Sequence, residues 1–323
     1  MTIDPKIIDM RQNINFLSPE FNIDFSQINT QNIPNYTKLR NTISQNYSIL
    51  KEQFKLISGD FGAMYQLFKQ LDTRTCTIYG PADSRYKEIL IKLNYEIKMI
   101  NRFENIESNI INNSLIIFAN PSFPDGAFYN LDDFMRSWKS SDNIIFIDES
   151  YLDFTNEKSA TRFLADFANL YILRSINSFY GNFGVNYSLL ISSILNIKNI
   201  EEVSAKNEIS IFDTVFLSSL FKDKSFTKIA KAIMAKNSIL LEKVLISSEL
   251  FEKIYPSRAN FILAKLKNIT ATKFTKELKC HNIMINDLTK SDFLGDKFVQ
   301  ISIKNEEEIK EFTKAIDNIK SNL

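Results

Sequence analysis

The stretch that decides the fold class is Leu115-Ile116-Ile117-Phe118-Ala119-Asn120-Pro121-Ser122-Phe123-Pro124-Asp125-Gly126. Its first five residues are apolar, as in central strands that are buried on both faces of a parallel sheet. Two prolines and a glycine follow directly, and these residue types favour a rigid turn. Ligands of open α/β sheets bind where such strands end. The stretch therefore predicts a buried strand that leads into a turn at the ligand-binding edge of a sheet.

Similar strand-like runs occur on both sides of this stretch, at residues 75–79, 95–100, 143–147 and 170–173. Segments with helical patterns lie between them, at residues 81–93, 130–139 and 160–167. Strands that alternate with helices are typical of an α/β domain with a mainly parallel sheet.

The pattern changes after about residue 200. A long helix is predicted over residues 222–245, and a smaller α+β unit follows it. In that unit we expect strands at residues 260–266, 283–285 and 298–303, and helices at 271–279 and 306–319. The first 50 residues are polar and do not form a domain of their own.

Composition excludes several classes of protein. The 323 residues carry 39 Lys and Arg against 38 Asp and Glu, so the net charge of +1 gives no basis for binding nucleic acid or an anionic membrane surface. A single His (His281) and two Cys (Cys76 and Cys280) exclude a disulfide scaffold and a structural zinc site, and we predict no metal. We expect His281 to lie at a helix end.

We also expect neither a signal peptide nor a membrane span from this sequence. Residues 1–6 contain no apolar core of a signal peptide, and the apolar runs are too short to span a membrane. We therefore predict a cytoplasmic protein.

Two further strand ends carry polar side chains. Ile147-Asp148-Glu149-Ser150-Tyr151 places two carboxylates and a phenol after a buried strand, and residues 173–184 place small polar residues and two glycines after another. Taken singly, the carboxylates fit helix capping and the small residues fit a polar turn.

The three strand ends together resemble the fold type I pyridoxal-phosphate enzymes, and within them the class I/II aminotransferases. The nearest branch is the histidinol-phosphate aminotransferase group with its threonine-phosphate decarboxylase relatives. The residues that carry the resemblance are NPSFPDG at 120–126, DESY at 148–151 and RSINSFYGNFGVNYS at 174–188. Weaker matches lie at residues 24–29, 34–40, 58–60, 81–86, 257–261 and 285–287, in the order in which the family has them.

This resemblance implies a three-layer α/β/α large domain with a mainly parallel sheet, over residues 51–235. It also implies a small α+β domain formed by residues 1–50 together with 236–323. Family members are usually dimers that bind pyridoxal phosphate, so the resemblance implies a homodimer and this cofactor.

The resemblance also assigns roles to single residues. Asp148 matches the carboxylate that pairs with the pyridinium nitrogen, and Tyr151 matches the phenol at the ring oxygen. The residues that it places around the cofactor are Gly59, Asp60, Asn120, Asp148, Tyr151, Ser175, Ser178 and Asn186.

The lysine that forms the Schiff base in the family falls on Ser178, and no Lys occurs between Lys158 and Lys198. Serine cannot form an imine, so we expect no internal Schiff base. Five other family positions are also replaced: an Asn by Phe123, the phosphate-binding Arg by Asn186, the stacking aromatic residue by Asp83, and two further Arg by Asn286 and Gln300.

Three interpretations follow from this pattern. The first is a catalytically degenerate aminotransferase homologue, or pseudoenzyme, that binds or regulates. The second is an enzyme that holds pyridoxal phosphate, pyridoxamine phosphate or another small phosphorylated ligand noncovalently. For this, Ser175, Ser178 and backbone amides near Gly59 are the candidate anion-binding groups, unless they are merely polar loop residues. The third is an active aminotransferase whose lysine lies elsewhere.

Overall fold

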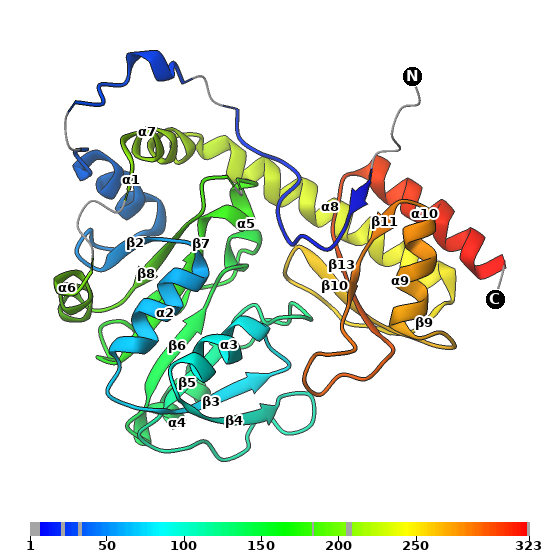
Figure 1. The fold of residues 1–323 in the computed structure, drawn as a ribbon, viewed down its shortest axis with the longest axis horizontal. Coiled ribbons are helices and arrows are strands. Elements are labelled where there is room, and N and C mark those ends of the chain that lie inside the picture. The colour runs from blue at the N-terminus through cyan, green and yellow to red at the C-terminus, as the bar shows by residue number, and fades with distance from the viewer. Residues whose placement is uncertain (1–6, 21–22, 32–33, 183, 205–208, 322–323) are drawn as a thin grey trace.

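The computed structural model describes residues 7–20, 23–31, 34–182, 184–204 and 209–321 (Figure 1). Residues 1–6, where we expect no signal peptide, and Phe183 of the motif at 174–188 lie outside these ranges. A large α/β part, coloured blue to green, and a smaller part, coloured orange to red, are bridged by the long helix α8 (Lys224–Ser248) (Figure 1).

The large part is built on a seven-stranded sheet with the order β2-β8-β7-β6-β5-β3-β4. Its strands are β2 (Phe54–Ser58), β3 (Thr75–Gly80), β4 (Glu96–Asn101), β5 (Leu115–Ala119), β6 (Ile144–Asp148), β7 (Leu170–Ser175) and β8 (Tyr187–Ile191). Only β8 runs antiparallel to its neighbours β2 and β7 among the pairs described. The sheet is therefore mainly parallel, as predicted.

Helices cover both faces of this sheet, because its central strands are apolar on both sides. Along β5, Ile116 and Phe118 pack into one core, and Leu115 and Ile117 pack into the other. The second core contains side chains of α2 (Asp60–Gln70), α3 (Ser84–Lys92) and α6 (Ile194–Glu202). The first contains side chains of α1 (Thr37–Tyr47), α4 (Asp132–Ser140), α5 (Ile176–Tyr180), α7 (Ile211–Leu220) and α8.

The smaller part contains a four-stranded antiparallel sheet with the order β12-β13-β10-β9. Its strands are β9 (Phe251–Ile254), β10 (Phe261–Leu266), β12 (Asn286–Asp287) and β13 (Phe298–Ser302). The helices α9 (Ala271–Cys280) and α10 (Glu306–Ser321) belong to this part. His281 follows α9 as its exposed C-cap, which confirms its expected place at a helix end.

The N-terminal residues contact both parts of the molecule. Strand β1 (Ile8–Asp9) pairs with β11 (Ile283–Met284) of the small part, whereas α1 packs against α7. The short 3-10 helix η1 (Phe25–Gln27) lies between them in sequence.

One predicted element is wrong. Residues 160–167 do not form an α-helix; the 3-10 helix η3 (Ala160–Phe163) and turns replace it. The carboxylate of Glu149 accepts the backbone N–H of Ala160 at 2.6 Å and the hydroxyl of Ser159 at 2.6 Å. This tertiary contact fixes the segment in a form that local helix propensity does not favour. A second 3-10 helix, η2 (Leu152–Phe154), follows β6.

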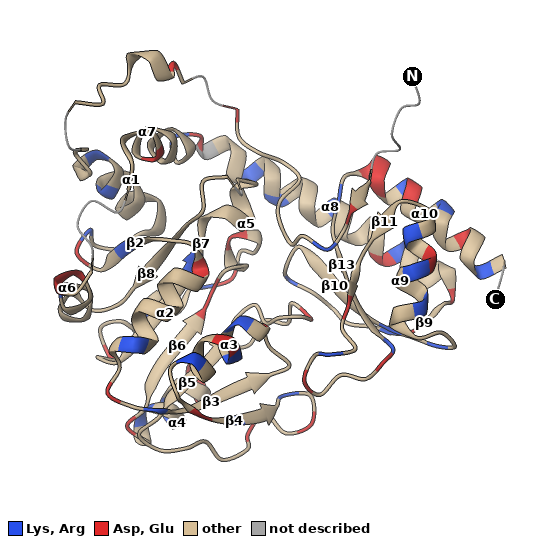
Figure 2. Ribbon diagram, in the orientation of Figure 1, with Lys and Arg blue, Asp and Glu red and all other residues tan. Residues whose placement is uncertain are grey.

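Charged side chains of both signs are mixed over the described elements (Figure 2). In the described part of the chain no helix has the length and apolar character of a membrane span. Nor do the described residues contain a group of His, Cys, Asp and Glu side chains that could hold a metal ion.

Candidate functional site

The predicted site residues gather where β6 and β7 end, near the start of α2. Asp148 is the last residue of β6, Ser175 is the last residue of β7, and Gly59 precedes the first turn of α2. The turn after β5 reaches the same edge, because Ala119 of β5 lies beside Asp148 of β6 in the parallel ladder. The sheet topology thus brings motifs that are far apart in sequence to one edge.

Asp148 is a buried carboxylate that is held by neutral donors. The phenol of Tyr86 donates to its Oδ2 atom at 2.5 Å, and the backbone N–H of Ser150 donates to its Oδ1 atom at 2.9 Å. The hydroxyl of Ser150 also donates to Oδ1. Burial raises the pKa of Asp148, although the hydrogen bonds from Ser150 and Tyr86 oppose that rise. Tyr86 thus belongs to the site as a direct partner of Asp148.

Tyr151 comes shortly after Asp148 in the sequence. Its ring packs edge-on against that of Phe261, with 4.9 Å between the ring centroids. Phe123 packs against the same ring at 5.8 Å. Burial and the charge of Asp83 raise the pKa of the Tyr151 phenol. Phe123, which the resemblance aligns with an amide of the family, therefore adds an aromatic ring to an apolar cluster.

Asn120 is almost fully buried and holds the turn after β5. Its amide donates to the backbone oxygen of Tyr129 at 3.0 Å, and its side-chain oxygen accepts the Tyr129 N–H at 2.9 Å. Its side-chain groups thus bind backbone here. Gly126 is needed in the same turn, because its φ is +72° and a Cβ atom there would lie 2.0 Å from Ser257 Oγ.

A buried ion pair between Arg102 and Asp125 holds the turn after β5 in place. Arg102 donates to both carboxylate oxygens of Asp125, at 2.9 and 2.6 Å, and to the backbone oxygen of Phe123 at 3.1 Å. The side chains of Arg102 and Asp125 are 1% and 4% exposed. Such a bidentate pair sets the geometry of the loop.

Gly59 and Asn186 lie against each other. The N–H of Gly59 donates to the backbone oxygen of Asn186 at 2.9 Å, and the φ of Gly59 is +69°. A Cβ atom at Gly59 would lie 3.0 Å from the side-chain nitrogen of Asn186. The side-chain oxygen of Asn186 in turn accepts from the amide of Asn177. Asn186, which the resemblance aligns with the family's phosphate-binding Arg, thus carries a neutral amide whose oxygen is bound to a neighbouring side chain.

Ser175 and Ser178 lie next to each other across the junction of β7 and α5. Their hydroxyl oxygens are 3.4 Å apart, with Ser178 as the donor. Ser175 is buried, and Ser178 is half-buried. The structure therefore places Ser178, which the resemblance aligns with the family's lysine, at the sheet edge beside Ser175.

Asp60, the first residue of α2, contributes a carboxylate to this edge. The hydroxyl of Ser188 donates to it, and Arg85 lies 3.6 Å from it. Arg85 also forms a two-pronged ion pair with Asp83, at 2.9 and 2.7 Å. One guanidinium thus lies between two carboxylates, and the three groups carry a net negative charge.

The small part closes the site with a network of amides. Gln300 is fully buried and donates to the backbone oxygen of Pro124 at 3.1 Å. Its side-chain oxygen accepts from Asn13 at 3.0 Å and from Asn286 at 3.1 Å. Asn13 also accepts the hydroxyl of Ser302 at 2.5 Å. Asn286 and Gln300, which the resemblance aligns with two Arg of the family, are therefore neutral and hydrogen-bonded to each other.

The sequence pattern did not assign roles to Arg85 and Asn13. Arg85 could have been placed beside Asp83, because a carboxylate that caps a helix accepts a backbone N–H of the first turn, here that of Arg85. Asn13 lies 287 residues from Gln300 in sequence, and no local pattern indicates that contact.

Comparisons with known proteins point to one group of enzymes. The histidinol-phosphate aminotransferase of Clostridium acetobutylicum is 27% identical over 303 residues, which is 89% of this chain and 82% of that protein. That of Flavobacterium psychrophilum is 23% identical over 314 residues, 93% of this chain and 89% of that protein. The Methanocaldococcus jannaschii enzyme is 25% identical over 224 residues, which is 67% of this chain and 58% of that protein. A scan against models of known protein families found no match.

Solved structures agree with these relatives. The crystal structure of the Clostridium acetobutylicum enzyme matches with a TM-score of 0.88 at 21% identity, and covers 98% of this chain and 100% of that one. L-threonine-O-3-phosphate decarboxylase of Porphyromonas gingivalis matches with a TM-score of 0.80 at 20% identity, over 97% and 99% of the two chains. The Sinorhizobium meliloti histidinol-phosphate aminotransferase, solved with pyridoxal 5'-phosphate, matches with a TM-score of 0.82 at 14% identity, over 98% and 92%. The chain therefore has the fold of the fold type I, pyridoxal-phosphate-dependent aminotransferases, with a large mainly parallel sheet and a small additional domain.

Proposed function

We propose that this chain is a catalytically degenerate homologue of the aminotransferases, which keeps their fold without their reaction. The observation that carries the proposal is Ser178. It lies at the lysine position of the motif, beside Ser175 at the end of β7. Transamination on pyridoxal phosphate needs an amine that attaches the cofactor and then moves a proton, and a hydroxyl can form no imine.

The side chains around Ser178 also fit the cofactor poorly. A phosphate dianion at the start of α2 would face the carboxylate of Asp60, whose charge repels it. Asn186 has no charge to offset the phosphate, and the stacking position carries Asp83. Phe123 has no polar side-chain atom for the ring oxygen. The residues present thus do not fit pyridoxal phosphate, and we derive no catalytic step through it.

Noncovalent binding of a phosphorylated ligand is the second candidate. Asp148, Tyr151 and the two serine hydroxyls favour it, because they keep hydrogen-bonding groups at the sheet edge. Arg85 adds a positive charge, but Asp60 and Asp83 already offset it. We therefore rank this candidate below the first.

An active enzyme with a displaced lysine has less support. Lys231, on α8, lines a cavity together with Arg174. Arg174 and Asp148 point to opposite faces of the sheet, because successive side chains of neighbouring parallel strands alternate. The amine of Lys231 is thus separated from Asp148 by the sheet.

A transamination assay tests the proposal. The purified chain is mixed with an excess of pyridoxal phosphate, histidinol phosphate and a 2-oxo acid, with the Clostridium acetobutylicum enzyme as the positive control. We expect no turnover by the wild-type chain. We also expect none from a Ser178→Lys variant, because Asp60, Asp83 and Asn186 remain. Turnover by the wild-type chain would overturn the proposal, and turnover by the variant alone would restrict the defect to residue 178.

We also infer a homodimer, because the resemblance implies one for this fold. Sedimentation equilibrium of the full chain tests this inference. A mass of twice 37.4 kDa is expected, and a mass of 37.4 kDa at all concentrations contradicts it. The cytoplasmic location likewise stays a prediction from the sequence.

A further inference from the structure

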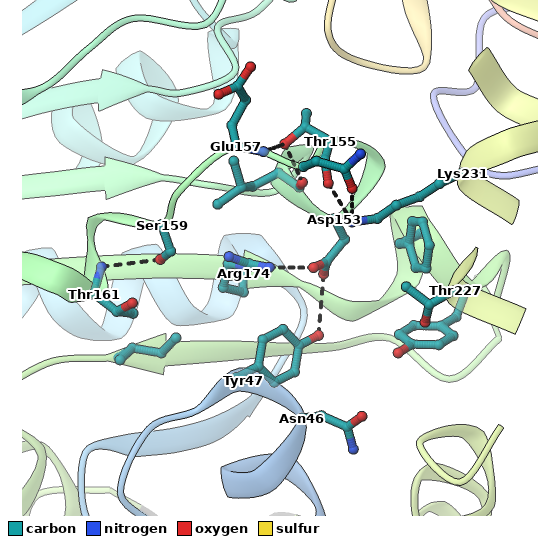
Figure 3. A pocket seen from close by; sticks show the side chains of 15 residues that line it. Asn46, Tyr47, Asp153, Thr155, Glu157, Ser159, Thr161, Arg174, Thr227 and Lys231 are labelled. Carbon is teal, nitrogen blue, oxygen red and sulfur yellow. Dashed lines mark hydrogen bonds and ion pairs between the residues drawn. The ribbon is translucent and has the colours of Figure 1, made fainter. Parts of the chain in front are cut away.

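A cavity of about 520 Å³ lies on the face of the sheet that carries Arg174, which is opposite the face of Asp148. Figure 3 shows the side chains that line it. Its walls come from the end of α1, the segment 152–161 after β6, strands β7 and β8, and helices α5 and α8. Three charged side chains, Asp153, Arg174 and Lys231, meet near its centre (Figure 3). Its volume is within the range of small-molecule sites.

Two of these charged side chains, Arg174 and Asp153, form an ion pair with each other. The guanidinium of Arg174 binds Glu149 at 2.9 Å and also Asp153, and it lies over the ring of Tyr47 at 5.1 Å. Asp153 accepts the Tyr47 hydroxyl at 3.3 Å. Arg174 and Asp153 are thus engaged in the structure itself and leave little charge for a ligand.

Lys231 differs from Arg174, because no carboxylate of the described chain lies within ion-pair distance of its amine. Its Nζ atom donates to the backbone oxygen of Thr155 and, at 3.4 Å, to the side-chain oxygen of Asn156. Two of its three N–H positions are therefore used on the segment that follows β6. The third has no acceptor among the hydrogen bonds of the described residues, and the side chain lines the cavity.

The same geometry orients the neutral amine. When Lys231 loses a proton, the two acceptors retain two N–H groups, and the lone pair takes the third position, toward the cavity. Burial lowers the pKa of Lys231 and Arg174 adds to this effect, whereas Asp153 opposes it. A lysine with a lowered pKa in a partly apolar cavity is the form of this side chain that acts as a nucleophile.

We propose that Lys231 is a covalent site for a small polar aldehyde. The amine nitrogen attacks the carbonyl carbon, and a C–N bond forms. The carbonyl oxygen then leaves as water with the two protons of the amine, and an imine remains. The step needs no oxidant or reductant. Asn46, Thr161 and Thr227 line the cavity with amide and hydroxyl groups, which suit the hydroxyls of a short carbon chain.

The test is a map of trapped adducts on the full chain. The folded protein is incubated with a limiting amount of glyceraldehyde and with cyanoborohydride, which reduces imines to stable amines. It is then digested and examined by mass spectrometry. We expect the Lys231 peptide to carry the most abundant adduct. The proposal would be overturned if the adduct were spread over the exposed lysines and the Lys231 peptide carried no more adduct than the Lys236 peptide. This comparison uses the wild-type chain, so it does not depend on the folding of a variant.

Two matched variants sharpen the test. Lys231→Arg keeps the charge and removes the primary amine, so most of the trapped adduct should be lost. Lys236→Arg is the control on the same helix, since its side chain is 71% exposed and ion-paired with Glu306 at 2.5 Å. It should retain the adduct. Equal adduct levels in the two variants would contradict the proposal, whatever the transamination assay shows.

Discussion

The two faces of the sheet at the ends of β6 and β7 differ in how their charged side chains are compensated. On the reverse face, Glu149, Asp153 and Arg174 form a buried ion-pair network. On the site face, the neighbouring Asp148 has only neutral donors, and Ser175 faces the hydroxyl of Ser178. Residues that are adjacent in sequence thus belong to an ion-pair network on one side and to a group held by neutral hydrogen bonds on the other.

This difference separates what the fold needs from what a cofactor needs. The buried pairs that position the turns, Arg102 with Asp125 and Arg174 with Glu149, are formed within the chain, although the Nε atoms of both arginines have no hydrogen-bond partner among the described residues. The residues that the resemblance places around a cofactor are neutral or acidic instead, among them Asp60, Asp83 and Ser178. The contrast is what we expect of a scaffold that is retained while its ligand-facing residues change.

The largest effect is expected on the reverse face. Arg174→Met leaves the carboxylates of Glu149 and Asp153 without their buried counter-charge, which should lower the free energy of unfolding by about 3–5 kcal/mol. Urea denaturation measures the change. Lys314→Met, which breaks the exposed pair with Glu311, is the control and should cost less than about 1 kcal/mol. Similar losses for the two variants would remove the contrast between buried network and surface pair.

A smaller effect is expected at the amide network that closes the site. Gln300→Leu leaves the Pro124 oxygen without its donor and removes the partner of Asn13 and Asn286. The free energy of unfolding should fall by about 1–3 kcal/mol in thermal or urea denaturation. Gln45→Leu on the exposed side of α1 is the matched control. If both variants are as stable as the wild type, the network does not stabilise the fold.

On the site face, Tyr86→Phe removes one hydrogen bond to Asp148. Hydrogen bonds to charged groups contribute about 1.5–3 kcal/mol, but Asp148 keeps its bonds from Ser150, so a loss at the lower end is expected. Tyr65→Phe, on the exposed face of α2, serves as the control. A loss as large as that of Arg174→Met would show that neutral hydrogen bonds on the site face stabilise the fold as much as the ion pairs on the reverse face.

The smallest effect is a difference in pH dependence. The pKa of Asp148 is raised above 3.8, mainly by burial, so the folded state holds this proton at a pH where the unfolded state has released it. The wild type should therefore lose stability relative to Asp148→Asn as the pH rises from about 3.8 through the raised pKa. Unfolding curves of both proteins over that range measure the slope. A flat difference would mean that folding leaves the pKa of this carboxyl unchanged, and a rising difference would mean that the carboxylate is stabilised as an anion; either result contradicts the prediction.

Much of the fold could be predicted from the sequence, because its strands are marked by continuous apolar runs such as residues 115–119. The segment 160–167 could not, since the contact of Glu149 with Ala160 depends on tertiary structure. At the site, the strand ends with Asp148 and Ser175 were predictable, because parallel strands end at one edge. The Arg85 ion pairs and the Asn13–Gln300 contact depend on side-chain geometry and on parts of the chain that are distant in sequence.

The central claim is that the ligand-facing residues no longer fit the cofactor of this fold. Equilibrium dialysis with pyridoxamine phosphate tests it most directly, because this compound has no aldehyde and cannot react with lysines such as Lys231. We predict no saturable binding to the wild-type chain. Saturable binding of one molecule per chain that is lost in the Asp148→Asn variant would contradict the claim, and would favour a noncovalent ligand at this edge of the sheet.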